Sequence, residues 1–390
     1  MALVMGIEQT GRSTLRAIWL NDFGGPERLV AAEAPDPVAG AGQALIEVAF
    51  ANVAFADTMF RAGAFGPLEA KLPTIPGNGV GGVVASVGVG VENELVGRRV
   101  VTNTGGAGGY AERAAVDVGG LFLVPDHLGL DSVLALLADG RTATMLVRAA
   151  ELGKGERVLV EAAAGGVGPL LVQLAQAAGA TVAAAAGGAR KVELARGLGA
   201  EVAVDYREPG WTARVREAVG GVDVVFDGVG GDIAESAFGL LRRGGRLLSF
   251  GMASGEWAGI STEAAADRGV KAVGIPRPTS EETRVFTESA MAEATAGRLR
   301  PVIGQRFPWS GQPTRTPPSR RGPPWARRCW RYGCGPSEVD VGRIPARTWS
   351  AWPAPPEPAR PLDGGGISTS LAHNLVAMAF VLTSLAGDSR

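Results

Sequence analysis

Between residues 155 and 275 the chain alternates short apolar runs with longer stretches in which apolar and polar residues mix. The apolar runs are RVLVEA (157–162), TVAAAA (181–186), EVAVDY (201–206), DVVFD (223–227), RLLSF (246–250) and VKAVGI (270–275). Near-continuous apolar strands separated by helices of about 10 to 15 residues are typical of a parallel sheet that is covered on both faces. The pattern therefore predicts a doubly wound α/β domain in this part of the chain.

A glycine-rich segment follows the first of these runs directly. It reads AAAGGVGPLLVQLAQAAGA, and Ala162, Gly165 and Gly168 fall at the spacing of the dinucleotide fingerprint, with alanine in the first glycine position. Small residues there permit a tight turn and let the backbone approach a pyrophosphate, and Gly166 and Val167 complete the loop. The following helix presents unpaired N–H groups and a positive dipole end to phosphates. Strand, loop and apolar helix together predict a nucleotide site rather than a purely structural turn.

The end of the second predicted strand bears on which nicotinamide cofactor binds. An NAD site usually carries an acid about 20 residues past the glycines, where it holds the ribose 2′-OH and repels a 2′-phosphate. This chain reads TVAAAAGGARKVELA, with no acid at the strand end. Gly187 and Gly188 leave room, and Arg190 and Lys191 supply positive charge, so NADPH is favoured. The alternative is that Arg190 and Lys191 are solvated residues in the first turn of a helix.

Length and charge limit the remaining possibilities. A chain of 390 residues with 46% hydrophobic content can bury a large core and is expected to form two domains. Its net charge of −1 gives no indication of a nucleic acid or acidic membrane partner. The longest apolar run, LVAMAFVLTSLAG near the C-terminus, is too short to span a bilayer, and no secretory signal is apparent. We therefore expect a soluble, cytoplasmic protein.

Few residues in the chain could bind a transition metal. The only cysteines are Cys329 and Cys334, and the only histidines are His127 and His373. Both cysteines lie in a C-terminal segment of unusual composition, and His127 lies in a loop rich in Pro and Gly. We therefore expect no metal site.

Several segments together resemble the medium-chain dehydrogenase/reductase superfamily, specifically its zinc-independent quinone oxidoreductase group. They are LRAIWLNDFGGPERL, PGNGVGGVVASVG, GGYAE, ADGRTATMLVRAA, ERVLVEAAAGGVG, FDGVGG and GRLRPVIGQRFP, which span residues 15 to 308. The resemblance implies a GroES-like, β-rich substrate domain at 15–137, a Rossmann cofactor domain at 138–278 and a return to the substrate domain at 279–308. It also implies an active site in the cleft between the domains, and a homodimer.

The same resemblance implies roles for individual residues. Lys191 and Tyr206 are similar to the pair that holds the 2′-phosphate in this group, although Tyr206 could also be a strand-end aromatic that only packs. Phe250 and Gly251 resemble the backbone contacts beside the nicotinamide. Thr142 occupies the position of a residue near the nicotinamide ring.

The resemblance also shows where this chain departs from its relatives. Zinc alcohol dehydrogenases place a Cys and a His-Glu pair where this chain has Ala54, Asn78 and Gly79, and their four-Cys lobe is missing, so hydride transfer without zinc is expected. Quinone oxidoreductases commonly read Val-Asn-x-x-Asp where this chain has Val53, Ala54 and Asp57. The amide that would face the nicotinamide is therefore absent.

No proton donor stands out. Asp57 could line the cleft, or it could be a surface or helix-capping carboxylate. Tyr110 in GGYAE is a possible donor, and the alternative is a buried Tyr that packs. Water can also protonate the reduced product, so a side-chain acid is not required.

The composition changes abruptly after residue 308. Five of the eight tryptophans fall between residues 309 and 352, among prolines and arginines and without regular periodicity. Each Trp codon is TGG, so a one-base shift turns Trp309, Trp325 and Trp330 into Leu, Met or Val codons. With permissible codon choices the shifted text reads LERAADAHAAIEARATVGKALLAV, an amphipathic helix and a short strand that resemble the family's usual ending.

We therefore expect residues 309–390 to be an irregular or disordered product of out-of-frame translation. Residues 1–14 are expected to be a non-native or disordered extension. Losing the closing helix and strand would expose the apolar surface that they cover.

These observations predict an NADPH-dependent, zinc-independent oxidoreductase. Its substrate would be a quinone or another small, apolar, conjugated carbonyl compound, in keeping with the few polar groups in loops 55–70 and 252–265. Two alternatives stay open. One is an enoyl-thioester reductase, and the other is an NADPH-binding protein without turnover, either by design or because the C-terminal segment has disabled it.

Overall fold

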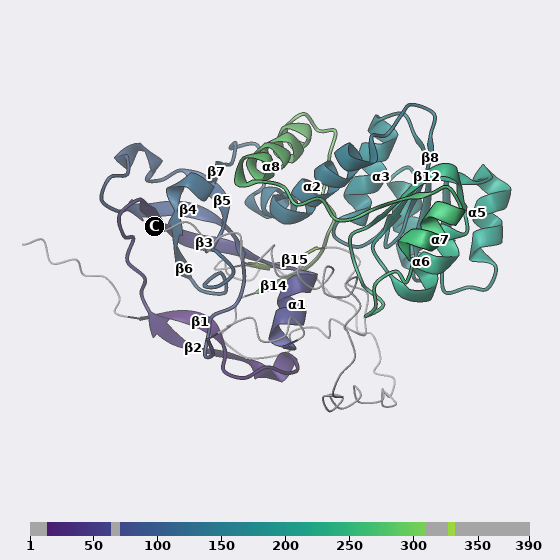
Figure 1. Ribbon diagram of the computed structural model, residues 1–390. Coiled ribbons are helices and arrows are strands. Elements are labelled where there is room, and N and C mark those ends of the chain that lie inside the picture. Colours follow the sequence, from purple (N-terminus) through teal and green to yellow (C-terminus); the bar gives the residue numbers. More distant parts are fainter. Residues whose placement is uncertain (1–13, 64–70, 309–326, 332–390) are drawn as a thin grey trace, which may run out of the picture. The chain divides into compact units, whose positions relative to one another are not determined.

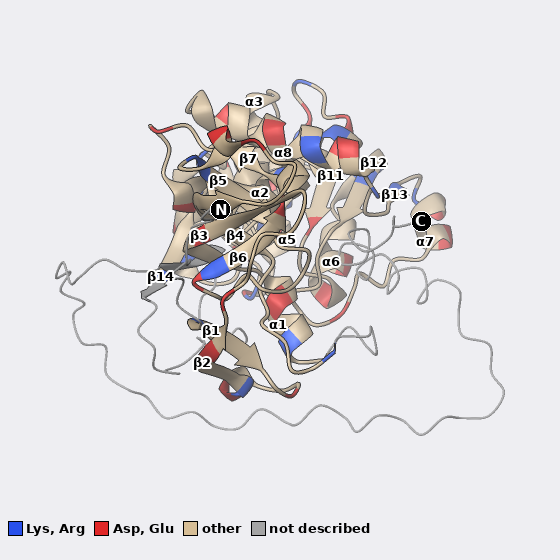
Figure 2. Cartoon of the chain, turned by 90° about the vertical axis from the view of Figure 1, so that its left-hand side faces the viewer, with Lys and Arg blue, Asp and Glu red and all other residues tan. Residues whose placement is uncertain are grey.

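The computed structural model describes residues 14–63, 71–308 and 327–331 (Figure 1). Internal contacts divide the chain into two units, Met1–Tyr332 and Gly333–Arg390, and the second unit lies outside the described residues. The predicted extension at 1–14 also lies outside them, apart from Thr14. Among the described helices, none is long and apolar enough to cross a membrane. Lys and Arg are intermixed with Asp and Glu over the described elements, and neither sign of charge dominates in the view of Figure 2.

A six-stranded parallel sheet forms the middle of the chain, as the apolar runs predict. Its strand order is β10-β9-β8-β11-β12-β13, with parallel pairing throughout. The strands are β8 (Arg157–Val160), β9 (Thr181–Ala186), β10 (Val202–Asp205), β11 (Val222–Asp227), β12 (Leu241–Ser249) and β13 (Lys271–Val273). This order is that of a doubly wound sheet, the predicted class of domain. Successive strands are added toward one edge from β8 to β10 and toward the other edge from β11 to β13.

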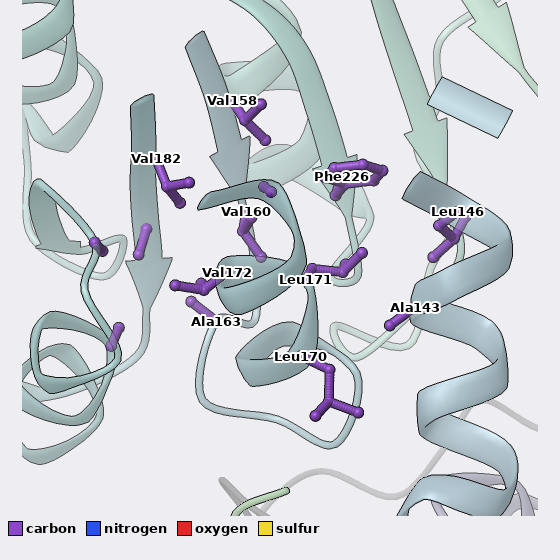
Figure 3. Packing of buried hydrophobic residues seen from close by; sticks show 14 of the residues in the cluster. Ala143, Leu146, Val158, Val160, Ala163, Leu170, Leu171, Val172, Val182 and Phe226 are labelled. Carbon is purple, nitrogen blue, oxygen red and sulfur yellow. The ribbon is translucent and has the colours of Figure 1, made fainter. Parts of the chain in front are cut away.

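Each face of this sheet packs in a core of its own. Successive side chains of a strand point to opposite faces, so they belong to different cores. Val158, Val160 and Phe226 belong to one core, which includes residues of α2 and α3 (Figure 3), whereas Leu159 and Val225 belong to a second core. The connecting helices are α3 (Gly168–Ala177), α4 (Ala189–Gly197), α5 (Trp211–Val219), α6 (Gly231–Phe238) and α7 (Thr262–Asp267). The uninterrupted apolar character of the strands is thus explained by cover on both faces.

A second, mainly antiparallel sheet has the order β14-β15-β3-β4-β5-β7, with β6 also paired to β3. Val48, Val80 and Val100 are among the residues of its core. The strands are β3 (Gln43–Val53), β4 (Gly79–Val87), β5 (Arg99–Asn103), β6 (Arg113–Asp117), β7 (Phe122–Leu123), β14 (Ile303–Pro308) and β15 (Arg327–Arg331). A separate hairpin consists of β1 (Thr14–Leu20) and β2 (Leu29–Pro35). The short helices are α1 (Phe55–Arg61) and the 3₁₀ turns η1 (Pro26–Arg28), η2 (Asn93–Leu95) and η3 (Val118–Gly120).

Helix α2 (Leu130–Ala150) crosses the expected domain boundary without a break. Leu134 and Leu137 pack with residues of β5 and the loop after β7, whereas Leu136 and Leu146 pack in the core of the parallel sheet. Helix α8 (Ser280–Thr295) packs along α2, where a Cβ on Gly140 would meet Ala290.

Strand β15 differs from the irregular structure that we expected after residue 308. It pairs in parallel with β14 and antiparallel with β3. Ladder hydrogen bonds use only backbone groups, so a strand edge can pair with a segment that lacks an apolar pattern. The expectation of irregular structure is therefore wrong for residues 327–331, and the other residues of the segment 309–390 lie outside the described ones.

Candidate cofactor-binding site

The turn between β8 and α3 has the tight geometry that the glycine motif predicts. Ala162 adopts a positive φ of 47°, which is uncommon for a residue with a Cβ. The Gly165 N–H donates to the Ala162 carbonyl at 2.7 Å, and the Ala163 N–H donates to Ala185 on β9 at 3.1 Å. A Cβ on Gly168 would collide with the same Ala162 carbonyl and would lie 2.8 Å from the Ala163 Cα. Position 168 therefore accepts only glycine without a shift of the backbone.

The N-terminus of α3 follows this turn immediately. Val167 is its N-cap and Pro169 occupies its first turn, so the free N–H groups of the helix point out of this end. Gly166 precedes the cap, and a Cβ there would collide with the carboxylate of Asp139 on α2. Asp139 is 9% exposed, and sequence analysis missed it because a single acid in a helical stretch matches no motif. The turn offers backbone donors and a positive dipole end to a pyrophosphate.

A second group of side chains surrounds the turn between β9 and α4. A Cβ on Gly187 would lie 3.0 Å from the Tyr206 hydroxyl, and one on Gly188, whose φ is 106°, would lie 2.8 Å from Nη2 of Arg207. Arg207 donates to both carboxylate oxygens of Asp205, at 3.0 Å from Nε and 2.7 Å from Nη2. The Gly188 N–H also donates to Asp205. Asp205 thus ties the end of β10 to the β9–α4 turn.

These contacts set the charges around the turn. The hydrogen bonds from Arg207 lower the pKa of Asp205 to about 2, so this carboxylate is ionised and compensated. Burial, with the nearby Arg207 charge as the second cause, lowers the pKa of Lys191. Burial, followed by the nearby carboxyl groups of Glu161 and Asp205, raises the pKa of Tyr206. Two cations and a neutral phenol therefore gather at Gly187 and Gly188, whereas Arg190 is exposed.

Sequence analysis missed Arg207 and Asp205. The available signal was a cation directly after Tyr206, at the end of the third apolar run. The sequence has no acid directly after β9, but an acid from β10 reaches the same turn. Its pairing with Arg207 removes much of the repulsion that it would exert on a phosphate.

Phe250 and Gly251, the two residues predicted to lie beside the nicotinamide, directly follow β12 and contact the residues at the end of β11. The Phe250 N–H donates to the Asp227 carbonyl at 2.8 Å. A Cβ on Gly251 would lie 2.8 Å from the Gly228 carbonyl oxygen, and one on Gly228 would lie 2.8 Å from the Phe250 ring. These close approaches bring the two strand ends together.

Thr142 lies on α2, where its hydroxyl donates to the Ala138 carbonyl at 2.7 Å. The hydroxyl thus bonds one turn back along its own helix.

The two candidates for proton transfer contact each other. The Tyr110 hydroxyl lies 3.1 Å from Oδ2 of Asp57, and the same oxygen accepts from the Ala54 N–H at 2.6 Å. Asp57 therefore caps the N-terminus of α1, one of the two roles that the sequence left open. Tyr110 is 3% exposed, and its ring packs so closely on Gly77 that a Cβ there would collide with it.

The positions that carry zinc ligands in zinc alcohol dehydrogenases have other contacts here. Asn78 accepts a hydrogen bond from the Gly106 N–H at 2.8 Å. A Cβ on Gly79 would collide with the amide of Asn52, a buried side chain that sequence analysis missed. Within residues 14–63, 71–308 and 327–331, no three His, Cys, Asp or Glu side chains form a group that could hold a metal ion.

Comparison with known proteins identifies the family. Residues 40–126 match the alcohol dehydrogenase GroES-like domain, and residues 166–292 match the zinc-binding dehydrogenase family. A quinone oxidoreductase of Mus musculus is 32% identical over 305 residues, which cover 77% of this chain and 92% of the mouse protein. The chain belongs to the quinone oxidoreductase group of the medium-chain dehydrogenases/reductases. The resemblance drawn from the sequence motifs is thereby confirmed.

Other members of this group differ in the substrates that their names give. A quinone oxidoreductase of Salmonella typhimurium is 35% identical over 247 residues, covering 63% of this chain and 75% of its own length. A 2-haloacrylate reductase of a Burkholderia species is 36% identical over 238 residues, covering 60% of this chain and 72% of its own.

Solved structures of the group confirm the two-part fold. The Escherichia coli quinone oxidoreductase complexed with NADPH has a TM-score of 0.71 and 27% identity, covering 81% of this chain and 99% of its own. A mycobacterial protein complexed with NADPH has a TM-score of 0.67 and 32% identity, covering 75% of this chain and 92% of its own. The predicted GroES-like and Rossmann architectures are both present, whereas the predicted domain boundaries stay predictions.

Proposed function

We propose that this chain is an NADPH-dependent oxidoreductase that transfers hydride to a quinone or another conjugated carbonyl compound. The observation that carries the proposal is the group of Lys191, Tyr206 and Arg207 around Gly187 and Gly188. It supplies charge and hydrogen-bond donors for a 2′-phosphate next to the β9–α4 turn.

The residues present fit this cofactor. Gly168 lets the turn close tightly against the Ala162 carbonyl, which any side chain would prevent, and the N-terminus of α3 that follows supplies N–H groups for a pyrophosphate. The Asp205 carboxylate, which would otherwise oppose a 2′-phosphate, is paired with Arg207. NADPH-bound relatives of the same fold agree with this assignment.

NADPH, when bound, supplies the hydride, and the protein side chains position it. The turn at 162–168 would hold the pyrophosphate, and Lys191, Tyr206 and Arg207 would hold the 2′-phosphate. Thr142, Phe250 and Gly251 would lie beside the nicotinamide and orient it toward the substrate. The Tyr110 hydroxyl already donates its hydrogen bond to Asp57, so we favour protonation of the product by water over protonation by either side chain.

We propose that the reaction needs no zinc, because Ala54 and Gly79 have no ligating atoms in their side chains and Asn78 is bonded to Gly106. Metal analysis of the purified protein is expected to find no stoichiometric zinc. Activity should survive prolonged dialysis against a chelator.

The substrate class is tested by NADPH oxidation with a panel of acceptors. Quinones should be reduced fastest, and a family relative named for 2-haloacrylate makes α,β-unsaturated acids the second set to include. Faster turnover of enoyl thioesters than of quinones would favour the enoyl-reductase alternative. NADPH binding without oxidation by any acceptor would favour a binding protein without turnover.

We also propose that the protein is a cytoplasmic homodimer. Analytical ultracentrifugation of the purified chain tests the homodimer, since a monomer would give half the molecular mass that a dimer gives.

A further inference from the structure

Two carboxyl groups lie together at the carboxyl ends of neighbouring strands. Val160 on β8 and Phe226 on β11 are paired in register, so Glu161 and Asp227 follow side by side. The Glu161 N–H donates to the Phe226 carbonyl at 3.0 Å, which continues the ladder to this point. Both side chains are 0% exposed. Buried acids are rare in protein interiors unless each has a partner.

Asp227 has two hydrogen-bond donors in the turn that follows it. Its Oδ1 accepts from the N–H groups of Val229 and Gly230 at 2.9 and 2.8 Å. Apart from the contact between the two carboxyl groups, neither oxygen of Glu161 nor Oδ2 of Asp227 has a hydrogen-bond partner among the described residues.

We assign the proton of the pair to Glu161, whose oxygens lack such donors. Burial raises the pKa of Glu161 well above its ordinary value, and the charge of Asp227 raises it further. Of the elements around Glu161, β9 and α3 have no titratable side chain. Nearby titratable groups come from the end of β10, where Tyr206 and Asp205 lie with Arg207, and from α2, whose Asp139 lies against Gly166 of the adjoining turn. A protonated Glu161 can donate its O–H to Asp227.

The pair lies where three parts of the proposed cofactor site meet. Glu161 directly precedes the turn at 162–168. Asp227 directly precedes the turn at 228–230, and its carbonyl accepts from the Phe250 N–H. A bond between the two side chains therefore connects the pyrophosphate turn with the nicotinamide-side segment.

We propose that Glu161 is a positioning residue for the cofactor, which holds these turns in register through a carboxylic acid to carboxylate hydrogen bond with Asp227. The inference rests on the proposed NADPH site. Ionisation of Glu161 would place a second negative charge in the pair. It would break the hydrogen bond to Asp227 and repel the phosphates of the cofactor. Affinity for NADPH should therefore fall as Glu161 loses its proton.

The test is a fluorescence titration of NADPH from about pH 6 to about pH 9 with the full chain and its variants. The wild type should lose about tenfold in affinity relative to Glu161→Gln as Glu161 gives up its proton with rising pH, because the amide can donate to Asp227 but cannot ionise. The 2′-phosphate of NADPH titrates equally with both proteins, so their difference isolates Glu161. Glu161→Leu should bind weakly at every pH, whereas the exposed control Glu201→Gln should follow the wild type.

Equal pH dependence of the wild type and Glu161→Gln would overturn the proposal, as would full affinity in Glu161→Leu. If no protein binds NADPH, the proposed function fails, and thermal unfolding then tests the pair by itself. A raised pKa gives stability that is complete below the ordinary carboxyl pKa and is lost as pH rises through the folded-state value. The wild type should therefore lose melting temperature with rising pH relative to Glu161→Gln, and parallel curves would reject the pair.

Discussion

At the scale of single residues, the proposed preference for NADPH depends on three neighbouring side chains. Arg207 pairs with Asp205, and Lys191 and Tyr206 lie close enough for this pair to influence their pKa values. Arg207 thus supplies a positive charge and also neutralises an acid. Removal of Arg207 should cost more than removal of Lys191, because it leaves the Asp205 carboxylate uncompensated beside the phosphate.

Lys191→Gln should weaken NADPH binding about tenfold, and Arg207→Gln by more than that, with little change for NADH. Asp205→Asn added to Arg207→Gln should restore part of the loss. Fluorescence titrations measure all of these affinities, and Arg196→Gln on the exposed end of α4 is the matched control. Equal losses for NADH and NADPH would show that these residues do not read the 2′-phosphate.

The glycine at position 168 gives a second prediction at this scale. Gly168→Ala should abolish NADPH binding and lower stability, because its Cβ would collide with the Ala162 carbonyl and force the turn open. Gly197→Ala is the control, since a Cβ there meets nothing within 4 Å and the position is helical. It should leave binding unchanged and stabilise α4 slightly. Equal behaviour of the two variants would contradict the tight-turn assignment.

The hydroxyl of Tyr110 gives a third prediction at the scale of single residues. If water protonates the product, Tyr110→Phe should keep kcat within about twofold and cost about 1 kcal/mol of stability through the lost bond to Asp57. Steady-state kinetics and thermal unfolding report the two effects separately. A loss of kcat of about a hundredfold or more, with KM unchanged, would instead identify Tyr110 as the proton donor.

At the scale of elements, helix α2 links two hydrophobic cores. Leu136 packs in the core of the parallel sheet, and the adjacent Leu137 packs with residues of β5 and the loop after β7. Both side chains are 0% exposed. A single rigid helix that supports both cores should make them unfold together.

Leu136→Ala and Leu137→Ala should each destabilise the protein by about 2 to 5 kcal/mol while unfolding remains a single transition. Leu123→Ala is the control, since Leu123 is 49% exposed and should change stability by no more than about 0.5 kcal/mol. Calorimetry distinguishes the outcomes. Two separate transitions, with each variant shifting only one of them, would show that α2 does not couple the cores.

At the scale of the whole molecule, strand β15 bears on the reading frame. Counted from residue 309, the shifted text places KALLAV at positions 327–332, and β15 spans Arg327–Arg331. The same edge of β3 and β14 is thus paired by the given sequence where the restored frame predicts a strand. Backbone pairing tolerates either text, and the apolar text also favours burial of side chains on a strand.

A chain with the frame restored after codon 308 should therefore melt several degrees higher than the given chain, because the predicted helix and strand would cover apolar surface. Both chains should bind NADPH if the cofactor domain folds independently of the C-terminal segment. Thermal unfolding and NADPH titration of the two purified chains measure this. Equal melting temperatures, or an intact given frame in resequenced isolates, would reject the frameshift.

The sequence by itself determined the parallel sheet and the glycine turn. Strands buried on both faces must be apolar throughout, and only small residues fit where a backbone approaches a phosphate, so both features leave a local pattern. Only the tertiary structure decided that the neighbouring residues Asp205 and Arg207 meet the turn at Gly188, that Tyr110 meets Asp57, and that Glu161 meets Asp227. The members of each of these contacts come from separate strands and loops. Their contacts therefore depend on strand order and register, which no local pattern of residues encodes.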